Sequence, residues 1–89
     1  MTKTKSRQPD PALVRRADRW ANRYLPDVRP SFRACVGEFL EWAADRGVDP
    51  RAVTPDEISA YREEMVERHG LREGPGRLAP VRAFLDWAS

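Results

Sequence analysis

The side chains that could carry acid–base, nucleophilic or metal chemistry are few in this chain and do not form a catalytic pattern. His69 is the only histidine and Cys35 the only cysteine, so together they cannot make a structural zinc site or an internal disulfide. Glu63 and Glu64 are neighbours on an expected helix and point in different directions, which argues against an acid–base pair. We therefore expect no enzymatic activity, no cofactor, no metal and no small-molecule substrate.

The glycine-rich segment Gly74–Gly76 does not read as a phosphate-binding loop either. It follows no strand, and its central proline removes an N–H group that a phosphate cradle needs. We interpret this segment as a turn and His69 as a charge that complements the C-terminal end of a helix. Cys35 lies on an apolar stripe and is interpreted as a small buried hydrophobe.

The basic side chains are the feature that suggests binding. Residues 1–34 carry nine basic and three acidic side chains, a net charge of +6, within a total of +2 for the chain. Residues 35–69 have a net charge of −5 and residues 70–89 of +1. All but two of the 16 basic residues are arginines, which favour bidentate contacts with phosphates and bases, although codon bias can also enrich arginine.

The chain divides into a basic tail, residues 1–9, and one domain, residues 10–89. The tail has no apolar periodicity, and its cations are Lys3, Lys5 and Arg7. Its composition is equally consistent with an arm that lies along phosphates and with an ordinary chain terminus. No signal peptide or long apolar run is present, so we expect a cytoplasmic protein without membrane contact.

The domain is organised around residues 31–47, which we expect to form the central helix. Its apolar residues recur at helical spacing: Phe32, Cys35, Val36, Phe39, Leu40, Trp42 and Ala43. Ser31 is the expected N-cap and Gly47 the expected left-handed stop. Because Phe39 and Trp42 are typical core residues, we expect them to be buried close to Phe84 of the last helix.

Two more helices have clear local start signals. Asp10 followed by Pro11 predicts the start of the first helix, which should stop by about Leu25 because Pro26 comes next. Thr54 and Glu57 have the spacing of a capping box and predict the start of the third helix.

We expect the third helix to end at Gly70, with Leu71 folding back on Val66. In the last helix, Pro80 is tolerable only in a first turn, where its missing N–H would have no intrahelical partner. Regular helix therefore begins close to Pro80 or includes residues 76–79 as its first turn, and residues 73–76 form a loop. No segment alternates with period two, so no strand is expected.

The order of these segments resembles the core-binding domain of tyrosine recombinases, the SAM-like N-terminal module of phage integrases and Xer-type recombinases. The similarity covers roughly residues 12–88 and rests on an aromatic residue, a Phe-Leu-x-Trp motif, a Val-Thr helix start and a closing Arg-x-Phe-hydrophobic-x-Trp motif. These are Phe32, Phe39-Leu40-Glu41-Trp42, Val53-Thr54 and Arg82-Ala83-Phe84-Leu85-Asp86-Trp87, with Tyr61 as the aromatic of the third helix.

The chain departs from the family in two respects. The family usually opens its last helix with a threonine, where this chain has Glu73 followed by Gly74–Gly76, and Pro80 then interrupts the helix itself. The catalytic Arg…His-x-x-Arg…Tyr set is absent, so neither Tyr24 nor Tyr61 is a candidate nucleophile.

The resemblance implies an all-α fold, a compact orthogonal bundle of four helices, and binding of double-stranded DNA as half of a clamp without catalysis. A recombinase catalytic domain or a full-length recombinase would be a further partner. The implied DNA contacts are a first set, Arg29, Ser31 and Arg33, and a second set, Arg72, Arg77 and Arg82, with Lys3, Lys5 and Arg7 extending the grip.

Other functions stay open at this stage. The domain could be a stand-alone protein-interaction module or a regulatory remnant of a recombinase, binding a partner through its acidic third helix. It could also be an excised piece with no role of its own, although the start at Met1 favours a natural short protein.

Overall fold

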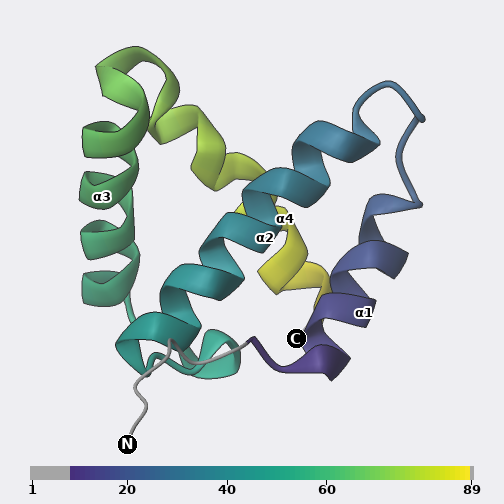
Figure 1. Cartoon of the computed structure of the whole chain (residues 1–89), viewed down its shortest axis with the longest axis horizontal. Coiled ribbons are helices and arrows are strands. Elements are labelled where there is room, and N and C mark those ends of the chain that lie inside the picture. The colour runs from purple at the N-terminus through teal and green to yellow at the C-terminus, as the bar shows by residue number, and fades with distance from the viewer. Residues whose placement is uncertain (1–8, 89) are drawn as a thin grey trace, which may run out of the picture.

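The computed structural model describes residues 9–88, which form four α-helices and two short 3-10 helices without any strand (Figure 1). The prediction of an all-α fold with four helices is therefore confirmed. The elements in chain order are α1 (Pro11–Ala21), α2 (Arg29–Arg46), η1 (Pro50–Ala52), α3 (Pro55–Glu73), η2 (Pro75–Arg77) and α4 (Leu78–Ala88). Across the described residues, no helix is long and apolar enough to span a membrane.

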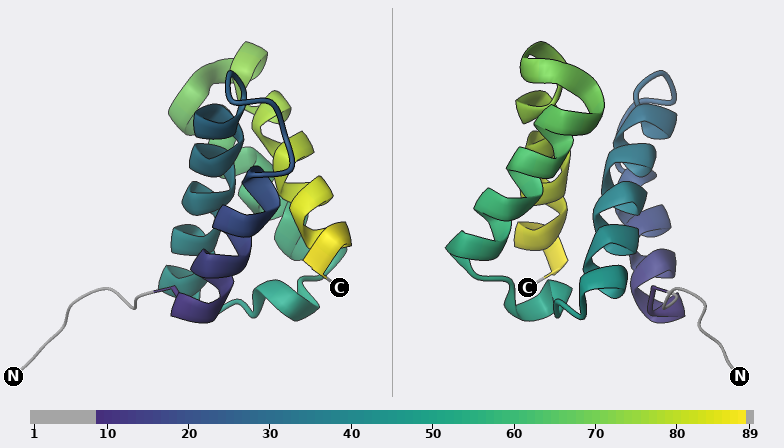
Figure 2. Two further views of the ribbon diagram at one scale, coloured as in Figure 1. Left: turned by 90° about the vertical axis from the view of Figure 1, so that its right-hand side faces the viewer. Right: turned by 60° about the vertical axis from the view of Figure 1, so that its left-hand side comes forward.

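The central helix α2 organises the bundle. It crosses in front of α4 in Figure 1, with α3 on the left and α1 on the right. Helix α4 packs against both α2 and α1, as the turned views show (Figure 2). The last turn of α4 is held to α1 by Arg16, whose guanidinium donates to the Ala88 carbonyl at 3.1 Å and lies over the Trp87 ring.

Three of the predicted helix boundaries are confirmed with their capping chemistry. The Asp10 carboxylate accepts from the Ala12 N–H at 2.9 Å at the start of α1. Thr54 and Glu57 form the complete capping box of α3, since each side chain bonds the other residue's backbone N–H. Gly47 ends α2 in the left-handed region, with φ of 70°.

The connection between α1 and α2 differs from the prediction. Helix α1 ends at Ala21, before Pro26 as expected, but α2 begins at Arg29, so Ser31 lies inside the first turn of α2 and is not its N-cap. Val28 occupies the cap position without a side-chain hydrogen bond. The chain can enter the helix this early because Pro at N1 or N2 needs no N–H partner.

The junction between α3 and α4 is more helical than predicted. Gly70 breaks α3 as expected, with φ of 90° and ψ of 166°, but a further helical turn continues up to Glu73 and η2 comes after it. The prediction of a loop over residues 73–76 is therefore wrong. Leu71 is 81% exposed, so the prediction that it folds back on Val66 is also wrong. The positive φ at Gly70 directs the next turn away from the helix axis.

Pro80 is the third residue of α4, which begins at Leu78. This position confirms that Pro80 lies in the first turn, where its missing N–H leaves no hydrogen bond unmade. The Pro80 ring is buried, so it also contributes to the packing of α4.

The core contains the predicted aromatic residues, which fall into two groups of ring contacts. Phe39 pairs with Trp42 and Tyr61 at centroid distances of 6.1 and 5.1 Å, and this group joins α2 to α3. Phe84 is equally buried, but its ring contacts are with Trp20 at 5.7 Å and with Trp87. The burial prediction is confirmed for Phe39, Trp42 and Phe84. The Phe84 ring contacts Trp20 of α1 because α4 packs against α1 as well as against α2.

Candidate nucleic-acid interface

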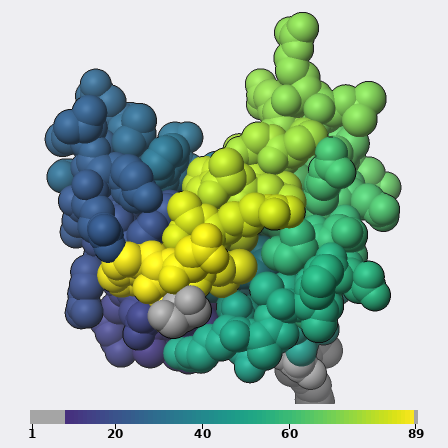
Figure 3. Space-filling view, turned by 180° about the vertical axis from the view of Figure 1, so that it is seen from behind, coloured from purple at the N-terminus to yellow at the C-terminus, as the bar shows by residue number. Residues whose placement is uncertain are grey.

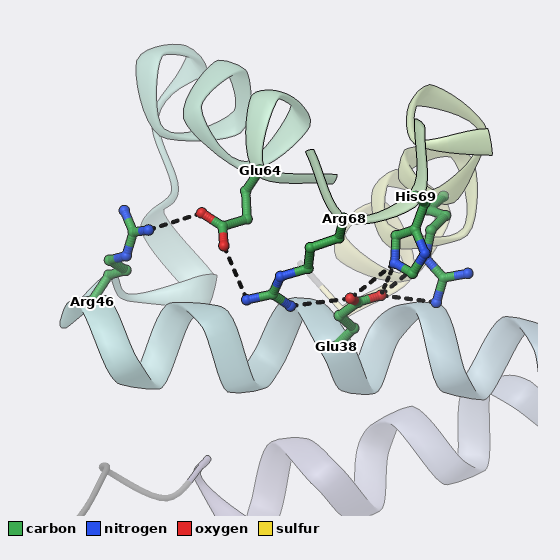
Figure 4. Close-up of polar contacts among 6 residues, drawn as sticks. Glu38, Arg46, Glu64, Arg68 and His69 are labelled. Carbon is green, nitrogen blue, oxygen red and sulfur yellow. Dashed lines mark hydrogen bonds and ion pairs between the residues drawn. The ribbon is translucent and has the colours of Figure 1, made fainter. Parts of the chain in front are cut away.

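Three basic side chains converge on the carboxylate of Glu38 in the middle of α2 (Figure 4). Arg77 donates to Oε1 from Nε at 2.9 Å, and its Nη2 lies 2.8 Å from the same oxygen. Arg68 donates to Oε2 at 3.1 Å, and Nε2 of His69 lies 3.1 Å from that oxygen. The side chain of Glu38 is only 18% exposed, so the carboxylate is largely enclosed by these partners.

This arrangement sets the charge of Glu38. Burial alone would raise the pKa of its carboxyl group, but the hydrogen bonds from His69, Arg68 and Arg77 outweigh burial and hold the pKa below its ordinary value. Glu38 is therefore ionised at neutral pH, and it neutralises part of the positive charge of its partners. The hydrogen bond to Glu38 in turn raises the pKa of Arg68.

The network continues along the α2–α3 interface. Arg68 also pairs with Glu64 at 3.0 Å, and Glu64 accepts from Arg46 at 2.9 Å (Figure 4). The guanidinium of Arg46 lies over the Trp42 ring, 5.5 Å from its centroid. Alternating charges thus connect the C-terminal half of α2 to α3.

Two surface hollows flank this network. We call the first the Glu38 hollow; its lining includes Arg33, Glu38, Glu41, Arg68, His69 and Arg77. We call the second the Cys35 hollow; its lining includes Ser31, Phe32, Cys35, Arg72, Arg77 and Pro80. Arg77 borders both hollows, so they are neighbours. From behind, Figure 3 shows the molecule hollowed between the segment that begins α2 and the segment that begins α4.

The predicted residues of the first set lie close to these hollows but in different environments. Arg33 lines the Glu38 hollow and makes an ion pair with Asp18 of α1. Ser31 is exposed at the edge of the Cys35 hollow. Arg29 turns toward α1, where it donates to the Tyr24 carbonyl at 2.8 Å and to the Asn22 carbonyl at 3.3 Å. Arg29 therefore caps the end of α1, and only Ser31 and Arg33 face the hollows.

The second set divides in the same way. Arg72 is exposed at the edge of the Cys35 hollow, and Arg77 is bound to Glu38. Arg82 is exposed on α4 and lines neither hollow. Within the described residues, neither Arg72 nor Arg82 makes an ion pair. Lys3, Lys5 and Arg7 lie outside the described residues.

The Glu38 network was not predicted from the sequence. His69 was interpreted as a complement to a helix end, and the structure instead turns its ring toward Glu38. A signal was present in the helical spacing, because Glu38 lies three residues after Cys35 and four before Trp42, two residues of the apolar stripe. A carboxylate at the edge of a buried stripe needs partners from a neighbouring element.

The remaining polar groups of the core do not make a reactive centre. Cys35 is buried, and burial raises the pKa of its thiol, which disfavours the nucleophilic thiolate. Burial likewise raises the pKa of Tyr61, whose hydroxyl has no hydrogen-bond partner among the described residues. In the same part of the chain, no three histidine, cysteine or carboxylate side chains are grouped to hold a metal.

Comparisons with known proteins do not assign the chain to a family. No protein-family model, curated protein or solved structure matches it.

Proposed function

We propose that this domain binds double-stranded DNA as a non-catalytic module similar to the core-binding domain of tyrosine recombinases, with that family's SAM-like arrangement of four helices. The observation that carries the proposal is that members of both predicted sets border neighbouring hollows. Residues near the start of α2 and residues before α4 are some 40 positions apart in the sequence, yet Arg33 and Arg77 line the Glu38 hollow, and Ser31, Arg72 and Arg77 line the Cys35 hollow.

The shape and the charge of this region both suit a nucleic-acid backbone. The Glu38 hollow adds Arg33 to the same end of the bundle, and Arg77 connects the two hollows. Both hollows are open to solvent, as a binding site for a rod-shaped polyanion must be. Arginines at such a site would contact phosphates and so fix the register of the domain on the duplex.

The ion pairs within the domain predict which arginines contribute most to DNA affinity. Arg72 makes no ion pair with a described residue, so it can contact a phosphate without breaking one. Arg33 is paired with Asp18, whose side chain is 60% exposed, and exchange of that carboxylate for a phosphate costs little. Arg77 is held by the enclosed Glu38, so its release costs more. We therefore expect Arg33 to contribute more to DNA affinity than Arg77.

A salt titration tests the proposal. With about four to six phosphate contacts, the logarithm of the binding constant should fall against the logarithm of salt concentration with a slope of about −4 to −5. A mobility-shift assay that detects no duplex binding at ~50 mM salt and micromolar protein would refute the function.

Single arginine variants then locate the interface. Arg72→Ala and Arg33→Ala should each make the slope shallower by about 1, because each removes one phosphate contact. Arg62→Ala is the matched control, since Arg62 is an exposed arginine on the outer side of α3. A larger loss of affinity from Arg77→Ala than from Arg33→Ala would show that Arg77 contacts DNA despite its bond to Glu38 and that our ranking of these two arginines is wrong.

A further inference from the structure

Four arginines of the basic N-terminal third belong to neither predicted DNA-binding set. Arg15, Arg16 and Arg19 lie on α1, Arg23 comes shortly after its end, and all four are exposed. Within the described residues, none of them makes an ion pair. They are four of the nine basic side chains in residues 1–34, so the proposed interface leaves a large part of that charge without a role.

Two of these arginines are held at one aromatic ring. The guanidinium carbons of Arg16 and Arg23 lie 5.4 and 5.9 Å from the centroid of the Trp87 ring, and we call these three residues the Trp87 cluster. Trp87 is half-buried on α4, and its ring contacts the buried Phe84 ring at 6.2 Å. Arg16 is fixed further by its hydrogen bond to the Ala88 carbonyl. Two cations on exposed side chains are thus gathered around a ring that is anchored on the core.

The positive charge of the Trp87 cluster is not neutralised by ion pairs within the described residues. The carboxylates nearest to it along the chain, Asp18, Asp27 and Asp86, form no ion pair with its two arginines. Asp18 is paired with α2 instead. A guanidinium has five N–H donors, and one backbone carbonyl of α4 accepts from Arg16. Both arginines therefore have donors left for an anion from solution.

The Trp87 cluster lies on the same side of the molecule as the Cys35 hollow. Ala83 lines that hollow, and Trp87 follows it by four residues, one turn further along the same side of α4. Phe32 also lines the hollow, and its ring contacts the Tyr24 ring at 4.9 Å, directly after the second arginine of the cluster. In Figure 3 the yellow α4 extends from the hollow to the blue and purple residues of α1. The hollow and the cluster are therefore parts of one surface.

We infer that the Trp87 cluster is a further phosphate-binding site, and that a DNA duplex bound at the Cys35 hollow continues across α4 to reach it. This inference rests on the proposed function, since it gives the same duplex a second place of contact. Guanidinium groups suit phosphates because they are planar, permanently charged and offer paired N–H donors. The ring contacts already restrict both side chains, so they lose less conformational entropy on binding than a freely mobile arginine does.

The salt dependence of duplex binding tests this site. Arg16→Gln/Arg23→Gln should make the slope shallower by about 2, because two phosphate contacts are removed. Arg23→Gln alone should make it shallower by about 1, and it leaves the hydrogen bond of Arg16 to α4 in place. Arg62→Gln is the matched control, because it removes one exposed arginine from the outer side of α3, and it should leave the slope unchanged.

Quenching of tryptophan fluorescence locates the contact. Trp20 and Trp42 are buried, so the quencher iodide reaches mainly Trp87. With chloride exchanged for iodide at constant ionic strength, Arg16→Gln/Arg23→Gln should be quenched less than the wild type, because the cations that attract iodide are removed. The uncharged quencher acrylamide is the control and should quench both proteins equally. A bound duplex should protect the wild type from iodide.

The possible results separate this inference from the proposed function. Wild-type binding with an unchanged slope in the double variant overturns the inference and leaves the DNA-binding proposal in place. Equal iodide quenching of the double variant and the wild type, or quenching that the duplex does not reduce, has the same meaning. Equal effects of Arg23→Gln and Arg62→Gln would show that net charge and not this site governs affinity, which also overturns the inference. No duplex binding by the wild type overturns both proposals.

Discussion

Replacement of Glu38 by glutamine should destabilise the domain measurably. The substitution keeps the shape of the side chain but removes the charge that His69, Arg68 and Arg77 share. The side chain of Arg68 is 45% exposed, so we expect its ion pair with Glu38 to contribute only about 0.5 kcal/mol to the stability of the fold, as exposed ion pairs do. The contacts with Arg77 and His69 are more enclosed, and together they bring the expected loss in the free energy of unfolding to about 2 kcal/mol.

For a domain of this size, that loss corresponds to a fall in Tm of about 8–16 °C. Thermal unfolding followed by circular dichroism measures it. Glu41→Gln is the control, because Glu41 lines the same hollow but is exposed and makes no ion pair with a described residue. If Glu38→Gln unfolds within about 2 °C of the wild type, as the control should, the Glu38 network does not stabilise the fold and our reasoning fails.

The pH dependence of this effect has a defined sign. The pKa of Glu38 is lowered in the folded protein, so its contribution is fully present above the ordinary glutamate pKa of about 4.3 and is lost as pH falls through the folded value. The groups that face it are Arg68, His69 and Arg77, with Tyr61 and Cys35 close by. The Tm difference between wild type and Glu38→Gln should therefore be present at neutral pH and shrink below about pH 4 as Glu38 takes up a proton. A difference that keeps its full size at about pH 2 would contradict this assignment.

Three further substitutions test the fold by urea denaturation. Phe39→Ala should cost about 3–5 kcal/mol, because the ring is fully buried between two other aromatic rings, and a cooperative transition close to that of the wild type would show that Phe39 is not central. Gly70→Ala should lower the free energy of unfolding by about 1–3 kcal/mol, because the positive φ at this position disfavours a side chain. Gly76→Ala is the control and should change that free energy by less than about 0.5 kcal/mol, because Gly76 has open space around it and no positive φ. Equal effects would mean that a side chain does not strain the Gly70 conformation. Thr54→Ala should cost about 1 kcal/mol through loss of the capping box, and no change in the denaturation midpoint would show that the cap is dispensable.

The parts of the fold that could be predicted from the sequence are those determined by neighbouring residues. The Asp10 cap, the Thr54 capping box and the Gly47 stop each depend on side chains and backbone groups within about one helical turn. The burial of Phe39 results from helical periodicity, which is also local. Each of these features is confirmed.

Two of the features that sequence reasoning missed depend on contacts that reach beyond one helical turn. The N-terminal boundary of α2 depends on a turn whose carbonyls are bonded by the Arg29 side chain, and Ser31 looked like a cap only in isolation. Glu38 finds partners 30 to 39 positions further along the chain. No spacing rule relates those positions before the helices are placed in space.

The same long-range contacts change what the arginines of this chain can do. From the sequence, Arg29, Arg33 and Arg77 look like equivalent surface cations near helix N-termini. In the structure, Arg29 bonds the carbonyls at the end of α1, Arg77 bonds the enclosed Glu38, and Arg33 pairs with an exposed aspartate. An arginine that stabilises its own fold must give up that contact to bind a phosphate, and the cost rises with the burial of the partner that it leaves. Under the proposed function, Arg72 is therefore the arginine of the two predicted sets that can bind DNA at the Cys35 hollow without a compensating loss of stability.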